Sequence, residues 1–559
     1  MLIDTIFGNG RFHTLDPARP QANRIGVLHG RIAGLDEELD GVRAERVIDL
    51  AGAPVVPGFN DAHQHLSMRG QRLRQLDLRP VAVSTVDDIY AAVAARAAQT
   101  PAGQWILGSG YDQNKTGAHP DRSRLDAVAG GHPVWLGHCS GHMGVANSTA
   151  FARMGFPDPG TVPDVDGGSV SRDAQGIPDG LLAERAQELV HALLRPYAFA
   201  DFVEAIRIGS EVAAAEGITS FAEPGIGSGG LAGNGAADLA AFTEASRSGK
   251  LRQRATLMPI AAALHEAGAF EPGGAAAEPW FGLDLGLRSG FGDDRVRIGP
   301  VKVFSDGSLI RRTAAMCEHY QGEPGNSGFL QQPAIELREL ILRAHRFGWQ
   351  IATHAIGDAA VQEVLDAYAE AQRTVARPDA RHRIEHCGLT SPEQVARIAE
   401  LGVIPVPQGR FIGELGDGML EALGVRRAGS AYRLRSFLDA GSVLPGSSDS
   451  PVVAAAPLLG IHDMVNRRTD SGVAFGADEA IEVAQALRAY TLGSAYAEHT
   501  ERDKGSLERG KLADFVVLDA DPFTVAPDRL SGIGIGATVI GGEPVYENGA
   551  LHYRIGRGI

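Results

Sequence analysis

Strand-like and helix-like segments alternate through the middle of this chain. Apolar runs typical of strands lie at residues 53–59, 217–225, 251–260, 296–307, 348–358, 381–388, 402–409 and 442–451. Several stretches between them carry apolar residues at helical spacing, as PAIELRELILRAHRFG does before it stops at Gly348. Eight strand–helix units in this order predict an α/β protein built on a (β/α)8 barrel of the TIM type.

Two parts of the chain do not fit this repeat. The first and second predicted strands are separated by residues 60–216, far more than an ordinary barrel connection. We therefore expect an inserted subdomain at about 67–200. The two ends, 1–56 and 505–559, contain short strands and turns, and neither end has enough strands to bury a core alone. We expect both ends to form one small β-sandwich, and residues 57–504 to form the barrel domain with its insertion.

Polar side chains stand where several of the predicted strands end. In PGFNDAHQHL, His63 and His65 are two residues apart and can therefore point to the same face of a strand. Later strands end in VKVFSDGS, IATHAIGD, RIEHCG and PGSSDSP. The resulting set of candidate residues is His63, His65, Lys302, His354, His386 and Asp449. Because barrel enzymes place their chemistry at this end of the strands, and imidazole and carboxylate suit zinc and similar divalent metals, the set predicts a metal site.

Several motifs of this chain resemble those of the amidohydrolase superfamily of metal-dependent hydrolases. PGFNDAHQH is similar to its first-strand signature, and GSLERGKLADFVVLDADP is similar to its C-terminal signature. KVFSDGSL, THAIGDAA, RIEHC, GSSDSPV and SGHMGVANSTAF resemble the branch that includes N-substituted formamide deformylase. The resemblance covers essentially the whole chain, and its motifs indicate the family but not the substrate.

The resemblance implies a site for one or two metal ions. His63 and His65 would bind one ion together with Asp449, and His354 and His386 would bind the second. Zinc is the first expectation, although manganese, iron or cobalt would also suit nitrogen and oxygen ligands.

Lys302 would bridge the two ions as a carbamate. A free ammonium cannot bind a cation, but a lysine desolvated beside metals has a lowered pKa and can react as the neutral amine with carbon dioxide. Two ions are expected if Lys302 is carboxylated. If it is not, a mononuclear site of His63, His65, His354 and Asp449 is expected.

The activity implied by the resemblance is hydrolysis of a carbon–nitrogen amide bond in a small molecule, of the N-formyl or N-acyl amine type. Metal-activated hydroxide would attack the carbonyl, and Asp449 would carry the proton to the leaving amine. One alternative is hydrolysis of a cyclic amide or deamination of a heterocycle. Deaminases of this fold usually carry a glutamate beside the histidine of the fifth strand, which THAIGD lacks. Another alternative, of a different class, is a non-catalytic scaffold or binding protein, which the complete ligand set argues against.

Charge and cysteine content bear on partners and location. The net charge of −16 without basic clusters argues against nucleic acid or an anionic membrane as the main partner. Three cysteines imply no disulfide framework, and no run reaches the about 18 apolar residues of a membrane helix. The first residues do not show the pattern of a signal peptide, so we expect none. We expect a cytoplasmic protein that acts on a small-molecule amide. Because proteins of this architecture often pair, a homodimer is the assembly to test.

Four further residues leave alternatives open. Glu223 either belongs to the site or holds a loop by a hydrogen bond, and we favour the loop. Arg312 pairs either with a substrate carboxylate or with Asp306. His142 lines the pocket or serves packing. Cys387 follows a candidate ligand on its strand and therefore faces the other side, so we expect it in the core.

Overall fold

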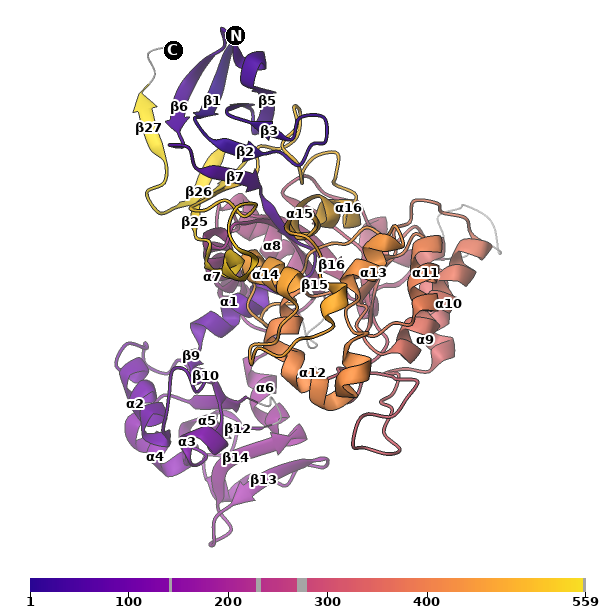
Figure 1. Cartoon of the computed structure of the whole chain (residues 1–559). Helices are drawn as coiled ribbons and strands as arrows, with labels where there is room; N and C mark the ends of the chain where they lie inside the picture. Colours follow the sequence, from indigo (N-terminus) through magenta and orange to yellow (C-terminus); the bar gives the residue numbers. More distant parts are fainter. Residues whose placement is uncertain (140–142, 228–232, 269–278, 556–559) are drawn as a thin grey trace. The chain divides into compact units, whose positions relative to one another are not determined.

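The computed structural model describes residues 1–139, 143–227, 233–268 and 279–555. The chain divides into two compact units, one of Met1–Leu66 with Ser210–Ile559 and the other of Ser67–Gly209. Figure 1 labels the helices and strands of both units. Each unit is described by itself below.

The two ends of the chain share two β-sheets in the first unit. The strand orders are β27-β6-β1-β4-β5 and β26-β25-β24-β7-β2-β3. The bounds are β1 Leu2–Gly8, β2 Arg11–His13, β3 Gln21–Ala22, β4 Ile25–Leu28, β5 Arg31–Leu35, β6 Arg43–Asp49, β7 Pro54–Pro57, β24 Phe515–Leu518, β25 Ile535–Ile540, β26 Glu543–Glu547 and β27 His552–Ile555. Apolar side chains of both ends form one buried cluster, in which the rings of Phe7 and Phe515 lie 4.9 Å apart. In Figure 1 the yellow C-terminal strands accordingly lie beside the indigo N-terminal ones.

Two four-stranded parallel sheets form the centre of this unit. Their orders are β19-β16-β15-β8 and β20-β21-β22-β23. The bounds are β8 Phe59–Asp61, β15 Ile218–Ile226, β16 Arg254–Pro259, β19 Val296–Ile298, β20 Val301–Phe304, β21 Ile351–Ala355, β22 Arg383–His386 and β23 Ile404–Val406. The predicted strand at 296–307 is thus two short strands separated by Gly299 and Pro300, where the proline has no N–H to donate. One parallel bridge, between Ile260 and Lys302, connects the two sheets.

Helices follow most of these strands. They are α8 Asp238–Arg247, α9 Ala334–Arg346, α10 Asp358–Thr374, α11 Pro392–Glu400, α12 Arg410–Ala428, α13 Leu434–Asp439, α14 Pro457–Asn466, α15 Val483–Arg488 and α16 Ser494–Ala497. The start of α11 agrees with its sequence signal, because the Ser391 side chain accepts from the Gln394 N–H and Pro392 takes the first helical position. Among the residues that the structure describes, no helix is long and apolar enough to cross a membrane.

The predicted strand at 442–451 does not form a strand. Asp449 has φ of 58°, a left-handed conformation that strand pairing does not use. The segment nevertheless runs beside the residues that follow β8. The Ala62 N–H donates to Gly446 O (2.9 Å), and the Asp449 N–H donates to His63 O (2.7 Å). These backbone bonds place Asp449 next to His63.

The second unit has a six-stranded sheet of order β13-β14-β12-β11-β10-β9. The strands are β9 Leu76–Asp77, β10 Ile106–Tyr111, β11 Val134–His138, β12 Met143–Ala146, β13 Gly168–Arg172 and β14 Pro178–Glu184. Among its helices are α2 Val86–Ala97, α4 Arg122–Val128 and α5 Ser148–Arg153, while α1 Leu66–Arg74 and α7 Phe199–Ala215 lie at the two boundaries. Ile89, Val93, Leu125, Val134 and Leu136 belong to a buried apolar cluster of this unit, which therefore has a core of its own.

Candidate metal centre

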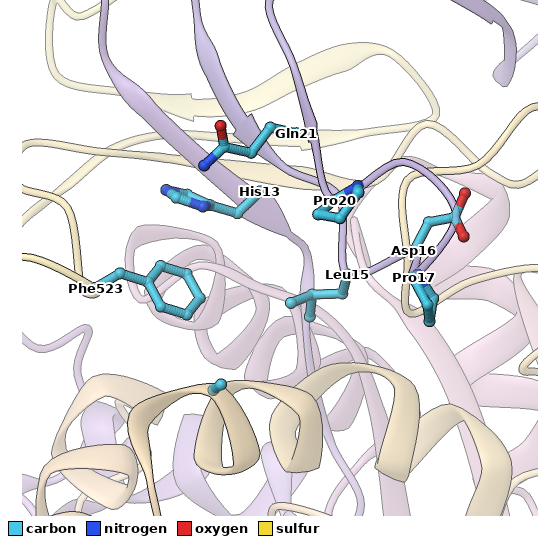
Figure 2. Close-up of a pocket in the computed structure, with 8 residues that line it drawn as sticks. His13, Leu15, Asp16, Pro17, Pro20, Gln21 and Phe523 are labelled. Atoms are coloured by element: carbon cyan, nitrogen blue, oxygen red, sulfur yellow. The ribbon is translucent and has the colours of Figure 1, made fainter.

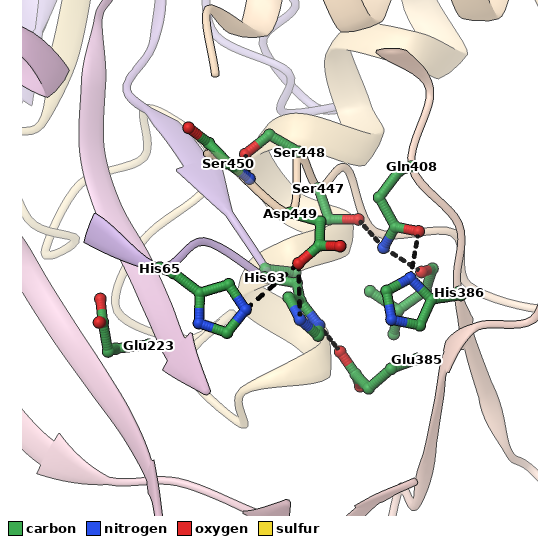
Figure 3. Close-up of polar contacts among 12 residues, drawn as sticks. His63, His65, Glu223, Glu385, His386, Gln408, Ser447, Ser448, Asp449 and Ser450 are labelled. Atoms are coloured by element: carbon green, nitrogen blue, oxygen red, sulfur yellow. Dashed lines mark hydrogen bonds and ion pairs between the residues drawn. The ribbon is translucent and has the colours of Figure 1, made fainter. Parts of the chain in front are cut away.

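Two histidines and a carboxylate converge just beyond the end of β8. The Nε2 atoms of His63 and His65 each lie 3.3 Å from Oδ1 of Asp449. Ligand atoms from all three residues lie within 4.8 Å of one another, and Figure 3 shows both rings beside the carboxylate. A tetrahedral ion with bonds of about 2.0–2.1 Å separates its ligands by about 3.4 Å. The donor atoms and their spacing therefore fit a divalent metal.

His63 is oriented by a buried ion pair. Its Nδ1 contacts the carboxylate of Glu385, which in turn accepts two hydrogen bonds from Arg383 (2.7 and 2.8 Å). Because an ionised carboxylate only accepts, Nδ1 of His63 carries a hydrogen and Nε2 is free to bind a metal. Burial opposes ionisation of Glu385, but Arg383 and His63 outweigh it and hold the pKa of Glu385 below its usual range.

Asp449 is ionised in spite of its burial. Desolvation raises the pKa of a buried carboxyl, but here the neighbouring side chains of His63 and His65 outweigh it and hold the pKa of Asp449 well below its usual value. The backbone reinforces this placement, because the His65 N–H donates to Ser450 O (2.8 Å). Asp449 therefore offers an anionic oxygen to a cation bound at this point.

A second pair of histidines lies close to the first. The ring centroid of His386 is 4.5 Å from that of His354 and 5.2 Å from that of His63. Nε2 of His354 lies 2.9 Å from Gly307 O, which can only accept, so Nδ1 of His354 has the free lone pair. Burial lowers the pKa of His386 to about 4 and that of His354 well below its usual value. Both rings are therefore neutral, which is the metal-binding form of imidazole.

Lys302 lies on β20 and is only 1% exposed. Its Nζ is 5.0 Å from the ring centroid of Phe304. Burial lowers the pKa of Lys302 to about 8, although the negative charges of Glu385 and Asp449 act in the opposite direction. With this pKa, about a tenth of the lysine is the neutral, nucleophilic amine at pH 7, far more than for a lysine with its ordinary pKa.

A further buried carboxylate holds the two segments of the site together. Asp61, the last residue of β8, accepts from the Ser448 hydroxyl (2.5 Å) and N–H (3.0 Å) and from the His63 N–H (3.1 Å). Burial raises the pKa of Asp61 to about 7, against the effect of these hydrogen bonds. Asp61 thus connects the histidine segment to the segment that carries Asp449.

The residues whose roles were left open have different outcomes. Glu223 accepts from the N–H of Leu66 (2.7 Å), the first residue of α1, and thus holds the backbone directly after His65. Cys387 is fully buried, as expected of a core residue. His142 lies outside the described residues. The expected pairing of Arg312 with Asp306 is wrong, because each of the two residues has other partners.

Arg312 contacts two other carboxylates, those of Glu323 and Glu421. Asp306 is used instead by the backbone. Its carboxylate accepts from the N–H groups of Ala315, Ile356 and Gly357 at 2.9–3.0 Å. Arg312 has a left-handed backbone (φ of 54°), and its side chain contacts the carboxylates of Glu323 and of Glu421 in α12.

Sequence reasoning missed Glu385 and Gln408 as partners of the histidines. Gln408 lies 2.7 Å from His386 Nδ1 through its Oε1. The signal for Glu385 is present in RIEH, where Arg383 and Glu385 are two residues apart and so share one face of the strand. An arginine and a glutamate on the interior face of a buried strand must pair, but the sequence does not reveal that the pair also contacts His63.

Two other features lie apart from this group. A surface cavity of about 430 Å³ is lined by His13, Leu15, Asp16, Pro17, Pro20, Gln21, Ala484 and Phe523. Figure 2 labels all of these residues except Ala484. The second unit brings Asp112, His138 and Cys139 within 4.8 Å of one another, but His138 Nε2 already contacts Gln113 Oε1 at 2.5 Å and Cys139 is exposed. Neither feature contains a residue of the predicted metal site.

Comparison with known proteins defines the class of protein first. A solved structure of an uncharacterized metal-dependent hydrolase from Pyrococcus horikoshii matches with a TM-score of 0.75 and 27% identity, over 94% of this chain and 99% of that one. The putative amidohydrolase YtcJ of Bacillus subtilis is 31% identical over 553 residues, which are 97% of this chain and 99% of YtcJ. The chain is similar throughout its length to metal-dependent hydrolases.

The sequence profile of the amidohydrolase family matches residues 46–546. An N-substituted formamide deformylase from Arthrobacter pascens is 30% identical, over 97% of this chain and 98% of that enzyme. The chain therefore belongs to the amidohydrolase family. It is a metal-dependent hydrolase that acts on carbon–nitrogen bonds.

Proposed function

We propose that this enzyme hydrolyses the amide bond of an N-formyl or N-acyl amine. The observation that carries the proposal is the convergence of His63 Nε2, His65 Nε2 and Asp449 Oδ1, with two neutral histidines beside them. The similarity to an N-substituted formamide deformylase supports a linear amide. The absence of a glutamate beside His354 in THAIGD argues against a deaminase.

The side chains of the site have two proposed roles, metal binding and proton transfer. His63, His65 and Asp449 would hold one divalent ion, for which zinc is the first candidate, and His354 and His386 would hold a second. When bound, such ions lower the pKa of water to about 7 and polarise a carbonyl. Asp449 accepts the proton of the attacking water and returns it to the nitrogen of the leaving amine, because its carboxylate is ionised where the water would lie.

We propose that Lys302 supplies the bridge between two ions. Its neutral amine would react with carbon dioxide, which forms the N–C bond of a carbamate and releases one proton. The carbamate presents two oxygens in place of an ammonium. Without this modification, His63, His65, His354 and Asp449 would hold a single ion.

We infer that the two parallel sheets belong to one (β/α)8 barrel, in which β19 and β20 share a position and 442–451 takes the eighth. The Ile260–Lys302 bridge supports the connection on one side, and the bonds from Ala62 and Asp449 support closure on the other. The shared cluster of the terminal strands supports a β-sandwich of 1–56 and 505–559, with 57–504 as the barrel domain and its insertion at about 67–200. A cytoplasmic location and a homodimer remain predictions.

The test is a substrate panel. The protein is reconstituted with zinc and bicarbonate and incubated with N-formyl amines, N-acyl amines and cyclic amides, and released amine is measured by mass spectrometry. We expect release from linear amides that a chelator abolishes. Turnover of cyclic amides alone, with metal bound, would contradict the proposed substrate class.

A further inference from the structure

Gln408 is a fully buried glutamine just after β23, and its side chain contacts His386 (Figure 3). The distance from its Oε1 to Nδ1 of His386 is 2.7 Å. Which end of the amide faces the ring matters, because an amide oxygen requires a hydrogen on Nδ1 whereas an amide nitrogen would require a lone pair there. The surrounding hydrogen bonds decide between these arrangements.

Ser447 and two backbone carbonyls orient the amide. Nε2 of Gln408 lies 2.9 Å from Val406 O, which can only accept, and 3.1 Å from Oγ of Ser447. Oγ of Ser447 lies 3.0 Å from Pro407 O, another pure acceptor. The hydroxyl hydrogen is therefore used on Pro407 O, and Oγ accepts from the amide N–H. The carbonyl oxygens of Val406 and Pro407 can only accept, and they therefore fix which atom donates in each of these hydrogen bonds.

The chain of hydrogen bonds ends on the ring of His386. With its nitrogen committed to Val406 and Ser447, the Gln408 amide presents oxygen to His386, so that Nδ1 is protonated and Nε2 keeps its lone pair. The opposite tautomer would set two lone pairs against each other. Turning the amide over would set its oxygen against two other acceptors in a buried place, the carbonyl of Val406 and Oγ of Ser447, which is unfavourable.

We propose that Gln408, oriented by Ser447, is a positioning residue that holds His386 in the Nδ1–H tautomer, so that Nε2 can bind a metal. The inference rests on the proposed metal site. Gln408 holds a hydrogen on Nδ1 of His386, as the charged Glu385 does for His63, but it adds no negative charge. Partners of this kind typically change metal affinity 10- to 100-fold.

The tautomer is measured directly in the metal-free full-length protein labelled with ¹⁵N-histidine. The His386 signals are assigned by their loss in the His386→Gln variant, and the protonated and unprotonated ring nitrogens differ in ¹⁵N shift. We expect the hydrogen on Nδ1. A hydrogen on Nε2 of His386 in the parent protein would overturn the inference, whatever the enzyme hydrolyses.

Zinc affinity, measured by competition with a chelator, supplies the second readout. Gln408→Met, nearly isosteric but with only a weakly accepting sulfur in place of the amide, should weaken zinc binding by about 10- to 100-fold. Gln408→Glu, which keeps an acceptor, should be closer to the parent than Gln408→Met, and Ser447→Ala should be intermediate because Val406 still holds the amide. Gln253→Met is the control, since Gln253 is equally buried and is bonded to Ser210 instead.

Each outcome separates this inference from the proposed function. Parent zinc affinity and an unchanged tautomer in Gln408→Met would overturn the role of Gln408 and leave the hydrolase proposal intact. A parent protein with the expected tautomer but no zinc binding would contradict the metal site and not the hydrogen-bond chain. If Gln408→Met does not fold, the inference is still tested by the zinc affinity of Ser447→Ala and by the tautomer of His386 in the parent protein.

Discussion

Arg383 and Glu385 form an ion pair inside the protein in which both side chains are completely buried. Nε and Nη2 of Arg383 lie 2.7 and 2.8 Å from the two carboxylate oxygens of Glu385. A third hydrogen bond joins Arg383 to Ala62 O (2.7 Å), one residue before His63. The pair thus controls both the backbone before His63 and the ring of His63.

Replacing Glu385 with glutamine should destabilise the metal-free protein strongly. The variant leaves the guanidinium of Arg383 buried without an opposite charge, and breaking a buried pair in this way typically costs about 3–5 kcal/mol. The free energy of unfolding in urea measures the loss. Glu318→Gln is the control, because Glu318 pairs with Arg426 at 3.1 Å on the exposed surface and should change stability by less than about 1 kcal/mol. Equal stability of the two variants would contradict the assigned role of Arg383 and Glu385.

Asp449→Asn should separate metal binding from turnover. The amide keeps an oxygen at the place of the carboxylate but cannot accept the proton of water, so kcat should fall by about 10²–10⁴-fold while most of the metal remains bound. Turnover of the best amide and metal content by mass spectrometry are measured on the same samples. Asp470→Asn, at an exposed partner of Arg410, should retain parent turnover. Near-parent kcat in Asp449→Asn would remove Asp449 as the proton carrier.

Carbamate formation at Lys302 should follow the lowered pKa of this lysine. With a pKa of about 8, the neutral fraction rises steeply between pH 6 and 8 and levels off above that. At constant dissolved carbon dioxide, the rate of carbamate formation in the metal-free protein, followed by ¹³C NMR with labelled bicarbonate, should rise in the same way and then level off. A lysine with its ordinary pKa of about 10.4 would give a rate still rising tenfold per pH unit at pH 9. That profile, or no carbamate, would contradict the proposed bridge.

Phe515→Ala tests the core shared by the two ends of the chain. Phe515 is fully buried and contacts Phe7 and Phe12, with ring centroids at 4.9 and 6.0 Å. Loss of such a ring typically costs about 3–5 kcal/mol, so thermal unfolding should begin at a clearly lower temperature. Phe291→Ala, at a side chain that is 59% exposed, should have an effect of about 0.5 kcal/mol. Similar effects of the two substitutions would mean that the terminal segments do not form one core.

The sequence predicts best where a local pattern determines the structure. The apolar runs at 217–225 and 348–358 correspond to β15 and β21, because buried parallel strands are apolar on both faces. The spacing of His63 and His65 predicted two side chains on one face of a strand, but both residues lie just after the end of β8. The strand predicted at 442–451 is wrong. Its backbone is irregular and is held by side-chain and main-chain hydrogen bonds to the end of β8 and the residues after it.

The partners of the candidate ligands were less predictable than the ligands. Glu385 contacts His63, which is far away in the sequence, and Gln408 contacts His386 at the end of the neighbouring strand β22. Nothing in the local sequence around Glu385 or Gln408 specifies these contacts. Arg312 shows the same limit, because the choice between Asp306 and two glutamates depends on which carboxylate the backbone already uses. Local patterns thus place residues on elements, whereas pairing between elements depends on the folded structure.

The most direct test of the central claim is a titration of the metal-free protein with zinc, in which bound metal and amine release from an N-formyl amine are measured on the same samples. We expect no release without zinc, and release that rises with bound metal until the site is filled by one or two ions. His63→Ala should lose both together. Amine release that does not depend on metal, or full metal binding without release of amine from any linear amide, would contradict the account.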